Sequence, residues 1–387
     1  MSDRPARILF LNHVSRMSGA EASLLDLTQA LNANRFTLTV ALPGPGPLAE
    51  ALASRDIRTC FLPFRRLRRS LNPLLAGETA WSMVRVAAGL RALCRRERID
   101  ILHANSDTAF LYAALCPTPP GVRKVWHSRD LAELGRGGRW LYARADRVIA
   151  ISEAVRRHLR RYATDESKLV TIHNGIDVAH FVPQGGRAAT RTALGLAAGT
   201  FLIGMAGQLV PGKRHDLFLD MAQRLGVALP DARFLVIGGD LFGDQPAYAR
   251  EIERRVRTPE LDGKVLLIGP RADVRPLYEA LDVLVHPASR EPFGRVVAEA
   301  MAMGKPVVAV NACGPAEIIR DGADGLLVPA DSADALAAAV LRLAQDGALA
   351  RRLGVAAAAR VRDAFSLGLL GERVERLYAE LLANVQH

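Results

Sequence analysis

Cysteines are few in this 387-residue chain, and long hydrophobic runs are absent. The four cysteines, spread between positions 60 and 313, form no Cys-x-x-Cys pair, which argues against a disulfide scaffold and a structural zinc site. The uncharged stretch Leu194–Gly212 contains five glycines, a proline and a glutamine, so it predicts a strand and a turn rather than a membrane span. The N-terminus is too short and polar for a signal peptide. We therefore expect a protein of a reducing cytoplasm, without a transmembrane helix.

Negative charge is scarce in the first half of the chain. Residues 1–180 contain 27 Lys and Arg but only 16 Asp and Glu, whereas residues 181–387 contain 24 of each. The net charge of +11 at pH 7 therefore belongs to the first half, and it indicates an anionic partner such as membrane lipid, nucleic acid or a phosphorylated substrate. The length and the 50% hydrophobic content predict two packed domains.

Short β-branched runs alternate with longer helical patterns along the chain. Most runs are apolar throughout, as is typical of strands buried on both faces. The expected strands are Ile8–His13, Thr37–Leu42, Arg58–Leu62, Asp100–Ala104, Arg123–His127, Arg147–Ile151, Leu169–His173, Phe201–Ala206, Arg233–Ile237, Lys264–Ile268, Val283–His286, Pro306–Val310 and Gly325–Val328. The expected helices are Ala20–Leu31, Trp81–Arg98, Glu153–Tyr162, His215–Leu225, Tyr248–Val256, Pro292–Met303, Ala333–Gln345 and Leu367–Leu382. This alternation predicts an α/β fold with parallel sheets.

The pattern starts again near the middle of the chain. Each half opens with an apolar strand, a glycine-bearing loop and a helix, and Phe181–Arg187 between them has the composition of a linker. We therefore expect two facing, doubly wound, Rossmann-like domains, residues 1–180 and residues 181–365. Ligands of such sheets bind beyond the carboxyl ends of the strands, so loops of both domains would line a cleft.

The most informative segment follows the apolar strand that ends at His286. Pro292 suits the first turn of a helix, so the backbone N–H groups that follow it would form an anion site. Glu291 lies just before that site, and Glu299 lies about two turns along, roughly 10 Å away at about 1.5 Å per residue. Two carboxylates at this spacing suit a long ligand lying along the helix. A dipole-favourable acid followed by a surface glutamate is the alternative interpretation.

Glu291 and Glu299 form a Glu-x7-Glu motif that, with the residues around it, resembles retaining glycosyltransferases of family 4, which have the GT-B fold. The resemblance extends over nearly the whole chain, and its motifs follow in the right order. The other matching segments are Ser18–Leu25, Val148–Glu153, Ile172–Asp177, Gly207–Lys213, Cys313–Ile319 and Asp321–Pro329. The GT-B fold also implies that a helix within residues 366–387 returns to the first domain.

The resemblance implies transfer of a sugar from a UDP- or GDP-linked donor to an acceptor hydroxyl, with the anomeric configuration retained and without a cofactor or a metal. Glu291 would bind donor-sugar hydroxyls, Glu299 would accept from the ribose hydroxyls, and Lys213 would neutralise the diphosphate. No covalent nucleophile stands out. The resemblance implies front-face attack, in which a phosphate oxygen takes the acceptor proton.

Further site residues follow from the same match. The additional donor-binding candidates are Gly19, Gly207, Gln208, Ile268, Arg271, Phe293 and Gly294. His127, at the end of a strand, is placed by the family beside the donor sugar and its phosphate, although a lone histidine is more often structural. His103 and Asn105 are weaker candidates for the acceptor side.

Gln208 departs from the family, because many relatives carry arginine at this position. Glutamine donates hydrogen bonds but carries no charge. Either Lys213 suffices with the helix dipole, or Arg214 or His215 compensates.

The densest positive runs are Phe64–Arg69 and Arg91–Arg98. The apolar residues Trp81, Val84, Ala88, Leu90 and Leu93 suggest an amphipathic helix at a membrane surface. A core-packing helix with a solvated basic end is the alternative. The leading hypothesis is a lipid-linked or polysaccharide acceptor in bacterial cell-surface glycan synthesis, with peripheral attachment to the inner face of the plasma membrane.

Three other functions stay open. The chain could act on a small soluble acceptor, or it could be a GT-B-type epimerase. It could also be a basic nucleic-acid-binding protein with a non-catalytic cleft. Against nucleic acid, we find no aromatic-rich RNA motif, zinc finger or recognition helix.

Overall fold

The computed structural model describes residues 4–64 and 73–383. The chain divides into two compact units. Unit 1 comprises Met1–Gly175 together with Leu367–His387, and unit 2 comprises Ile176–Ser366. The chain thus passes from one unit to the other at Gly175, a few residues before the expected boundary at 180.

The expected linker, Phe181–Arg187, is bonded into unit 2. The backbone N–H groups of Gln184 and Gly185 donate to the Glu279 carboxylate at 3.0 and 2.8 Å. The Phe181 side chain is buried. These contacts make the segment part of unit 2 rather than a free linker.

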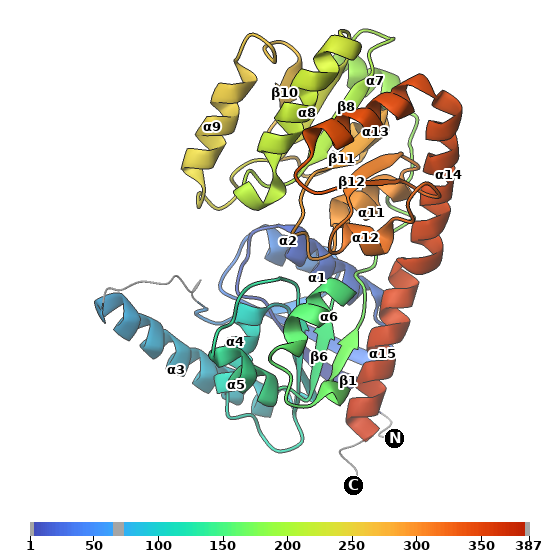
Figure 1. Cartoon of the computed structure of the whole chain (residues 1–387). Helices are drawn as coiled ribbons and strands as arrows, with labels where there is room; N and C mark the ends of the chain where they lie inside the picture. The colour runs from blue at the N-terminus through green and yellow to red at the C-terminus, as the bar shows by residue number, and fades with distance from the viewer. Residues whose placement is uncertain (1–3, 65–72, 384–387) are drawn as a thin grey trace. The chain divides into compact units, whose positions relative to one another are not determined.

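Unit 1 is built on a seven-stranded parallel sheet with the order β3-β2-β1-β4-β5-β6-β7 (Figure 1). Its strands are β1 (Ala6–Leu11), β2 (Phe36–Leu42), β3 (Arg58–Phe61), β4 (Ile101–Ala104), β5 (Arg123–Ser128), β6 (Arg147–Ala150) and β7 (Leu169–Thr171). Leu11 pairs with Ala104, and Ala104 pairs with Trp126. The carboxyl ends of β1, β4 and β5 therefore meet at one edge of the sheet.

The helices of unit 1 are α1 (Gly19–Ala30), α2 (Pro47–Ala53), α3 (Pro73–Arg96), α4 (Asp107–Leu115), α5 (Gly137–Ala143), α6 (Glu153–Arg160) and α15 (Leu367–Ala383). The last of them packs along α1, which confirms that the C-terminal helix returns to the first unit (Figure 1). A Cβ at Gly371 would lie 2.4 Å from the Ala30 carbonyl oxygen, so only glycine permits this approach. Tyr378 lies with Phe10 in the core between α15 and the sheet.

Unit 2 is built on a six-stranded parallel sheet with the order β10-β9-β8-β11-β12-β13. Its strands are β8 (Leu202–Ala206), β9 (Arg233–Ile237), β10 (Val265–Leu267), β11 (Val283–His286), β12 (Val307–Val310) and β13 (Leu326–Val328). Its helices are α7 (Arg187–Ala193), α8 (His215–Ala228), α9 (Pro246–Val256), α10 (Arg275–Ala280), α11 (Arg295–Ala302), α12 (Pro315–Ile318), α13 (Ala333–Gln345) and α14 (Gly347–Ala364). The residues of β8 and β11 are buried on both faces, as their continuous apolar sequences predict.

Every expected strand is present, and the bounds differ by at most two residues. Two expected helix starts are wrong: the helix predicted from Trp81 begins at Pro73, and the helix predicted from Pro292 begins at Arg295. Gly294, its N-cap, has φ +99°, in the left-handed region that favours glycine. Pro292 therefore lies in the loop before α11.

Candidate active site

The loop after β8 carries Lys213. It is held against the end of β9, because the Gly207 N–H donates to the Ile237 carbonyl and the Leu209 N–H donates to the Gly239 carbonyl. A Cβ at Gly238 would lie 1.8 Å from the Gly207 carbonyl oxygen, so the loop lies too close to the backbone for a side chain there. A short 3₁₀ turn, Pro211–Lys213, then leads into α8.

The loop after β11 carries Glu291. Its backbone carbonyl accepts a hydrogen bond from the Gly314 N–H at 3.0 Å, which ties the loop to the start of α12. The Glu291 side chain is buried, with 10% of it exposed. Both loops follow the carboxyl ends of neighbouring strands, where ligands of doubly wound sheets bind.

The two loops meet at a charged contact. The Lys213 ammonium donates to Glu291 Oε2, and His286 Nε2 lies 3.4 Å from the same oxygen. Burial alone would raise the pKa of Glu291, but the Lys213 ammonium and the His286 ring together hold it well below its usual range. The carboxylate is therefore ionised at neutral pH and is available to accept hydrogen bonds.

Glu299 lies on α11 and is also buried. Its carboxylate accepts hydrogen bonds from Tyr278 Oη at 3.1 Å and from Arg295 Nε at 3.0 Å. Burial raises the pKa of the Tyr278 phenol well above its usual value, and the Glu299 charge adds to that effect. These two donors fix the orientation of the Glu299 carboxylate.

Three other donor-side candidates lie in unit 2. The Phe293 ring packs edge-on against Phe365, with ring centroids 5.9 Å apart, so the side chain belongs to the core. The Ile268 N–H donates to the Val236 carbonyl at 3.2 Å, which leaves it unavailable to a nucleobase. Arg271 is exposed and donates to the Pro270 carbonyl.

Arg214 and His215, which follow Lys213, are the two candidates to supply the positive charge that Gln208 lacks. The Arg214 guanidinium is bonded to Asp216 and Asp331. His215 is fully buried, and burial, with a smaller contribution from Lys213, lowers its pKa to about 4. His215 is therefore neutral at physiological pH, and Arg214 is paired with two aspartates. Of these three consecutive residues, Lys213 is the one that places a positive charge against Glu291.

In unit 1, the first loop ends at the N-terminus of α1. Ser18 is the N-cap, and Gly19 is the exposed first residue of the helix. The Ser18 hydroxyl donates to the buried Glu21 carboxylate, which also accepts from Asn12 Nδ2 at 3.0 Å. These side-chain hydrogen bonds join the start of α1 to the end of β1.

A buried polar network occupies the carboxyl ends of β1, β4 and β5. Arg129, which the sequence analysis missed, donates to Asn105 Oδ1 at 2.8 Å and to Asn174 Oδ1 at 2.7 Å. Asn105 donates in turn to Asn12 Oδ1 and to the Ala20 carbonyl. The polar atoms of Asn105, expected on the acceptor side, are thus bonded within unit 1.

His127 is fully buried at the end of β5, and its Nε2 has no hydrogen-bond partner within residues 4–64 and 73–383. Its Nδ1 faces His103 Nε2 at 3.1 Å. His103, the other acceptor-side candidate, is fully buried between His127 and Tyr378 of α15. No local sequence signal could indicate Tyr378, because it follows His103 by 275 positions.

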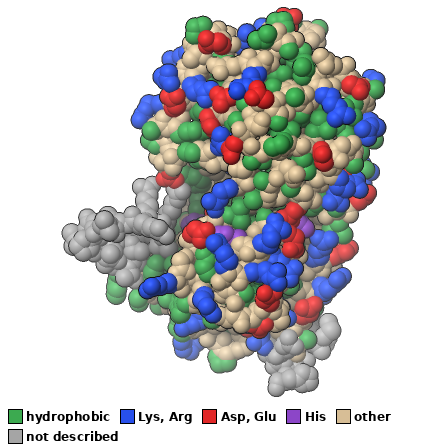
Figure 2. Space-filling model, in the orientation of Figure 1, with side chains coloured by type: hydrophobic (Ala, Val, Ile, Leu, Met, Phe, Trp, Pro, Cys, Tyr) green, Lys and Arg blue, Asp and Glu red, His purple; other side chains and the backbone are tan. Residues whose placement is uncertain are grey.

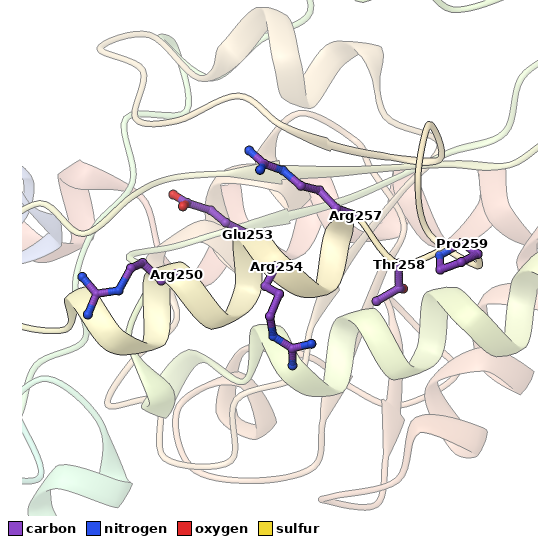
Figure 3. A pocket seen from close by; sticks show the side chains of 6 residues that line it. All are labelled: Arg250, Glu253, Arg254, Arg257, Thr258 and Pro259. Atoms are coloured by element: carbon purple, nitrogen blue, oxygen red, sulfur yellow. The ribbon is translucent and has the colours of Figure 1, made fainter.

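A separate shallow hollow lies along α9, and Figure 3 shows the side chains that line it. They are Arg250, Glu253, Arg254, Arg257, Thr258 and Pro259. None of them is an expected site residue. Among the described residues, no group of three His, Cys, Asp or Glu side chains is placed to hold a metal ion, and no helix is long and apolar enough to cross a bilayer.

Two family models together match most of the chain. Residues 17–180 match Glycosyltransferase Family 4, and residues 187–360 match Glycosyl transferases group 1. The D-inositol 3-phosphate glycosyltransferase of Nocardia farcinica is 34% identical over 81% of this chain and 69% of its own length. The lipopolysaccharide core biosynthesis mannosyltransferase LpsB of Rhizobium meliloti is 29% identical over 98% and 99%.

The matches to some relatives cover less than two thirds of those relatives' length. The match to the D-inositol 3-phosphate glycosyltransferase of Kineococcus radiotolerans, 34% identical, covers 60% of this chain and 57% of that protein.

Among solved structures, Anabaena Alr3699/HepE in complex with UDP-glucose has a TM-score of 0.84 at 24% identity, over 97% of this chain and 99% of that one. The expected GT-B fold, two parallel-sheet Rossmann-like units, is thereby confirmed. On its sequence motifs, its fold and these relatives, the chain belongs to glycosyltransferase family 4, among the glycosyl transferases group 1.

Proposed function

We propose that this chain transfers a sugar from a nucleoside diphosphate-sugar to an acceptor hydroxyl and retains the configuration at the anomeric carbon. The observation that carries the proposal is the contact between Lys213 and Glu291. It unites the two side chains to which the family motif assigns the diphosphate and the donor sugar. A cation for the leaving group and a carboxylate for the sugar hydroxyls are the charges that such a transfer uses.

Donor binding would exchange this contact for two others. The diphosphate would take the Lys213 ammonium, and sugar hydroxyls would donate to Glu291. Both side chains are within one ion pair, so each is already charged and oriented before the exchange. The low pKa of Glu291, set by Lys213 and His286 against the effect of burial, keeps it an acceptor at neutral pH.

Leaving-group stabilisation would fall mainly to Lys213. Arg214 is occupied by two aspartates, and His215 is neutral because burial lowers its pKa to about 4. Gln208, half-buried at the start of the same loop, could add a hydrogen bond without charge. The sequence has no Asp-x-Asp motif, so we propose that side-chain and helix-dipole charges serve the diphosphate without a metal.

The reaction would follow front-face attack. The acceptor oxygen would bond to the anomeric carbon as the bond from that carbon to the phosphate oxygen breaks, and the acceptor proton would pass to the phosphate. Glu299 would hold the ribose hydroxyls, the backbone around Gly294 would face the donor, and His127 would contact the sugar. The chain would contribute orientation and charge rather than a covalent nucleophile.

The relatives support a proposal for the classes of donor and acceptor. One structural neighbour holds UDP-glucose, one relative is a lipopolysaccharide mannosyltransferase, and several are D-inositol 3-phosphate glycosyltransferases. We propose a UDP- or GDP-linked hexose as donor and a lipid-linked or polysaccharide acceptor. A small phosphorylated acceptor is the second candidate, favoured by the inositol-phosphate relatives.

A membrane-linked acceptor is supported by α3, whose solvent face is partly apolar. Trp81 and Val84 are 65% and 60% exposed, and the exposed Arg85 and Arg95 lie on the same face at helical spacing. Leu90 and Leu93, expected on this apolar face, are instead buried on the opposite one. The basic run Phe64–Arg69 lies outside the described residues beyond Phe64. We propose that this face attaches peripherally to anionic lipid at the cytoplasmic surface.

A nucleic-acid function has weaker support. On the face shown in Figure 2, Lys and Arg side chains are interspersed with Asp and Glu rather than gathered into one continuous basic surface. Several arginines of unit 1 are also paired, among them Arg58 with Glu97 and Arg160 with Glu166. Pairing of this kind reduces the field that a phosphate backbone would meet.

The test is a screen of UDP-, GDP- and ADP-sugars, first by thermal shift and then by release of the nucleoside diphosphate. We expect a UDP- or GDP-sugar to raise the melting temperature of the protein and to be cleaved. NMR of the product should show the same anomeric configuration as in the donor. An inverted product would contradict the retaining mechanism. Failure of every nucleotide sugar to bind would contradict the proposed function itself.

A further inference from the structure

A line of three hydrogen-bonding side chains runs from α15 to the end of β5. Tyr378 Oη lies 2.6 Å from His103 Nδ1, and His103 Nε2 lies 3.1 Å from His127 Nδ1. All three side chains are fully buried. The helix that begins after unit 2 thus reaches the one histidine that the family motif assigns to the site.

The packing leaves the three rings little freedom. His103 stands edge-on to both His127 and Tyr378, with ring centroids 5.2 and 5.8 Å apart, and Phe10 covers it at 4.8 Å. Burial lowers the pKa of both histidines well below the ordinary value, and the nearby Arg129 charge adds to the effect. Each ring is therefore neutral, with one nitrogen that donates and one that accepts.

Arg129 decides which nitrogen is which. Its Nη2 lies 3.4 Å from His127 Nδ1, and its other nitrogens are anchored on Asn105 and Asn174. A guanidinium only donates, so His127 Nδ1 must accept. His103 Nε2 then has to be the nitrogen that donates to His127, and His103 Nδ1 accepts from the Tyr378 hydroxyl.

The remaining proton of His127 lies on Nε2. That atom is buried and has no acceptor in the described part of the chain. An unsatisfied buried N–H is costly, and a ligand oxygen placed against it would remove the cost. The opposite tautomer would set the His127 Nδ1 proton against the Arg129 guanidinium, which has no acceptor to offer it.

We propose that Tyr378 is a positioning residue: acting through His103, it holds His127 as the tautomer that donates from Nε2 to a substrate oxygen. The identity of that oxygen, on a nucleotide sugar, rests on the proposed function. The orientation of the three rings does not, because it follows from the Arg129 contact and two hydrogen bonds between the rings, all within unit 1.

The first test is independent of activity. Long-range ¹⁵N–¹H correlations on the full chain with ¹⁵N-labelled histidine report which ring nitrogen carries the proton. We expect His127 and His103 to be protonated on Nε2 alone, with their signals assigned by loss in His127→Ala and His103→Ala. A proton on His127 Nδ1 would overturn the proposal.

Tyr378→Phe removes only the hydroxyl and keeps the ring in its packing. We expect it to change the ring-nitrogen signals of His103 and to shift those of His127. Tyr142→Phe is the matched control, because Tyr142 is a buried tyrosine of unit 1 whose hydroxyl donates to the Asp165 carbonyl, outside the histidine line. Unchanged histidine signals in Tyr378→Phe, or equal changes in Tyr142→Phe, would contradict the assignment.

A double-mutant cycle links the geometry to turnover, measured as release of UDP from UDP-glucose. Loss of one neutral hydrogen bond predicts about a fivefold fall in kcat for Tyr378→Phe. In the His127→Ala background the same change should cost nothing more, whereas a further loss of the same size would show that Tyr378 acts elsewhere. If the wild-type chain cleaves no UDP-glucose, the choice of donor fails, while the NMR result still decides the role of Tyr378.

Discussion

Lys213 and Glu291, 78 positions apart, form an ion pair between the loops that follow β8 and β11. The pair exists because both loops leave the carboxyl ends of adjacent central strands. One partner alone would be a buried charge, since the Glu291 side chain is only 10% exposed. Each charge therefore offsets the cost of burying the other, and we propose that a diphosphate and a sugar replace these contacts when the donor binds.

Lys213→Ala should weaken binding of UDP and slow turnover. In the proposed binding mode, removal of the ammonium leaves the diphosphate without the charge of Lys213, and a fall in kcat of about 100-fold is expected for loss of one such group. The measurements are calorimetric titration with UDP and nucleotide release. Lys264→Ala is the control, because Lys264 lies before β10 and outside both site loops; an equal effect there would remove Lys213 from the site.

Glu299→Gln should raise the Kd for UDP about tenfold, as expected for loss of a charged hydrogen-bonding group. An amide has one accepting oxygen, whereas the carboxylate serves Tyr278, Arg295 and, in the proposal, the ribose hydroxyls. Calorimetry with UDP and GDP measures the change. Glu253→Gln, on the exposed face of α9, should leave both affinities unaltered. Unaltered affinity in Glu299→Gln would place the ribose elsewhere.

His215 should make the chain less stable as the pH falls from about 6.5 to about 4. Burial depresses its pKa to about 4 from 6.5, so within that window the unfolded chain binds a proton that the folded chain does not. Urea unfolding should show that His215→Gln lowers the slope of stability against pH by about 1.4 kcal/mol per pH unit near pH 5. The exposed His180→Gln should keep the wild-type slope. The same slope in His215→Gln would mean that the ring is protonated when folded.

Trp81→Ala should reduce binding to anionic vesicles roughly tenfold, the effect of withdrawing one large apolar side chain from the lipid surface. Vesicle flotation at low salt measures it. Trp140→Ala is the matched control, since Trp140 is 38% exposed on α5 and packs against Arg144. Absence of the wild-type chain from the lipid fraction would contradict peripheral attachment and favour a small acceptor.

The strands could be predicted because each is a short apolar run bounded by turn residues. Several helices could not. Arg187 and Arg191 of α7 bond to Asp282 and to the carbonyls around it, so that helix is stabilised by residues distant in sequence rather than by its own periodicity. The 18-residue α14 was also missed, because its alanine-rich sequence has no sharp apolar stripe.

The parts of the candidate site that lie within short family motifs could be predicted from the sequence. Glu291, Glu299 and Lys213 lie in short segments with a family pattern, and the structure brings two of them into contact. The contacts that orient them were not predictable. Arg129 and Tyr378 make their contacts with residues 24 and 275 positions away, and the N–H of Ile268 is used within the sheet.

Turnover of a UDP- or GDP-sugar by Glu291→Gln tests the central claim most directly. The change keeps the shape of the side chain but removes the charge that pairs with Lys213 and would bind the donor sugar. We predict that nucleotide release falls at least about 100-fold, while the affinity for free UDP and the circular dichroism spectrum stay close to those of the wild type. Wild-type turnover by this variant would contradict the assignment of the Lys213–Glu291 pair as the donor site.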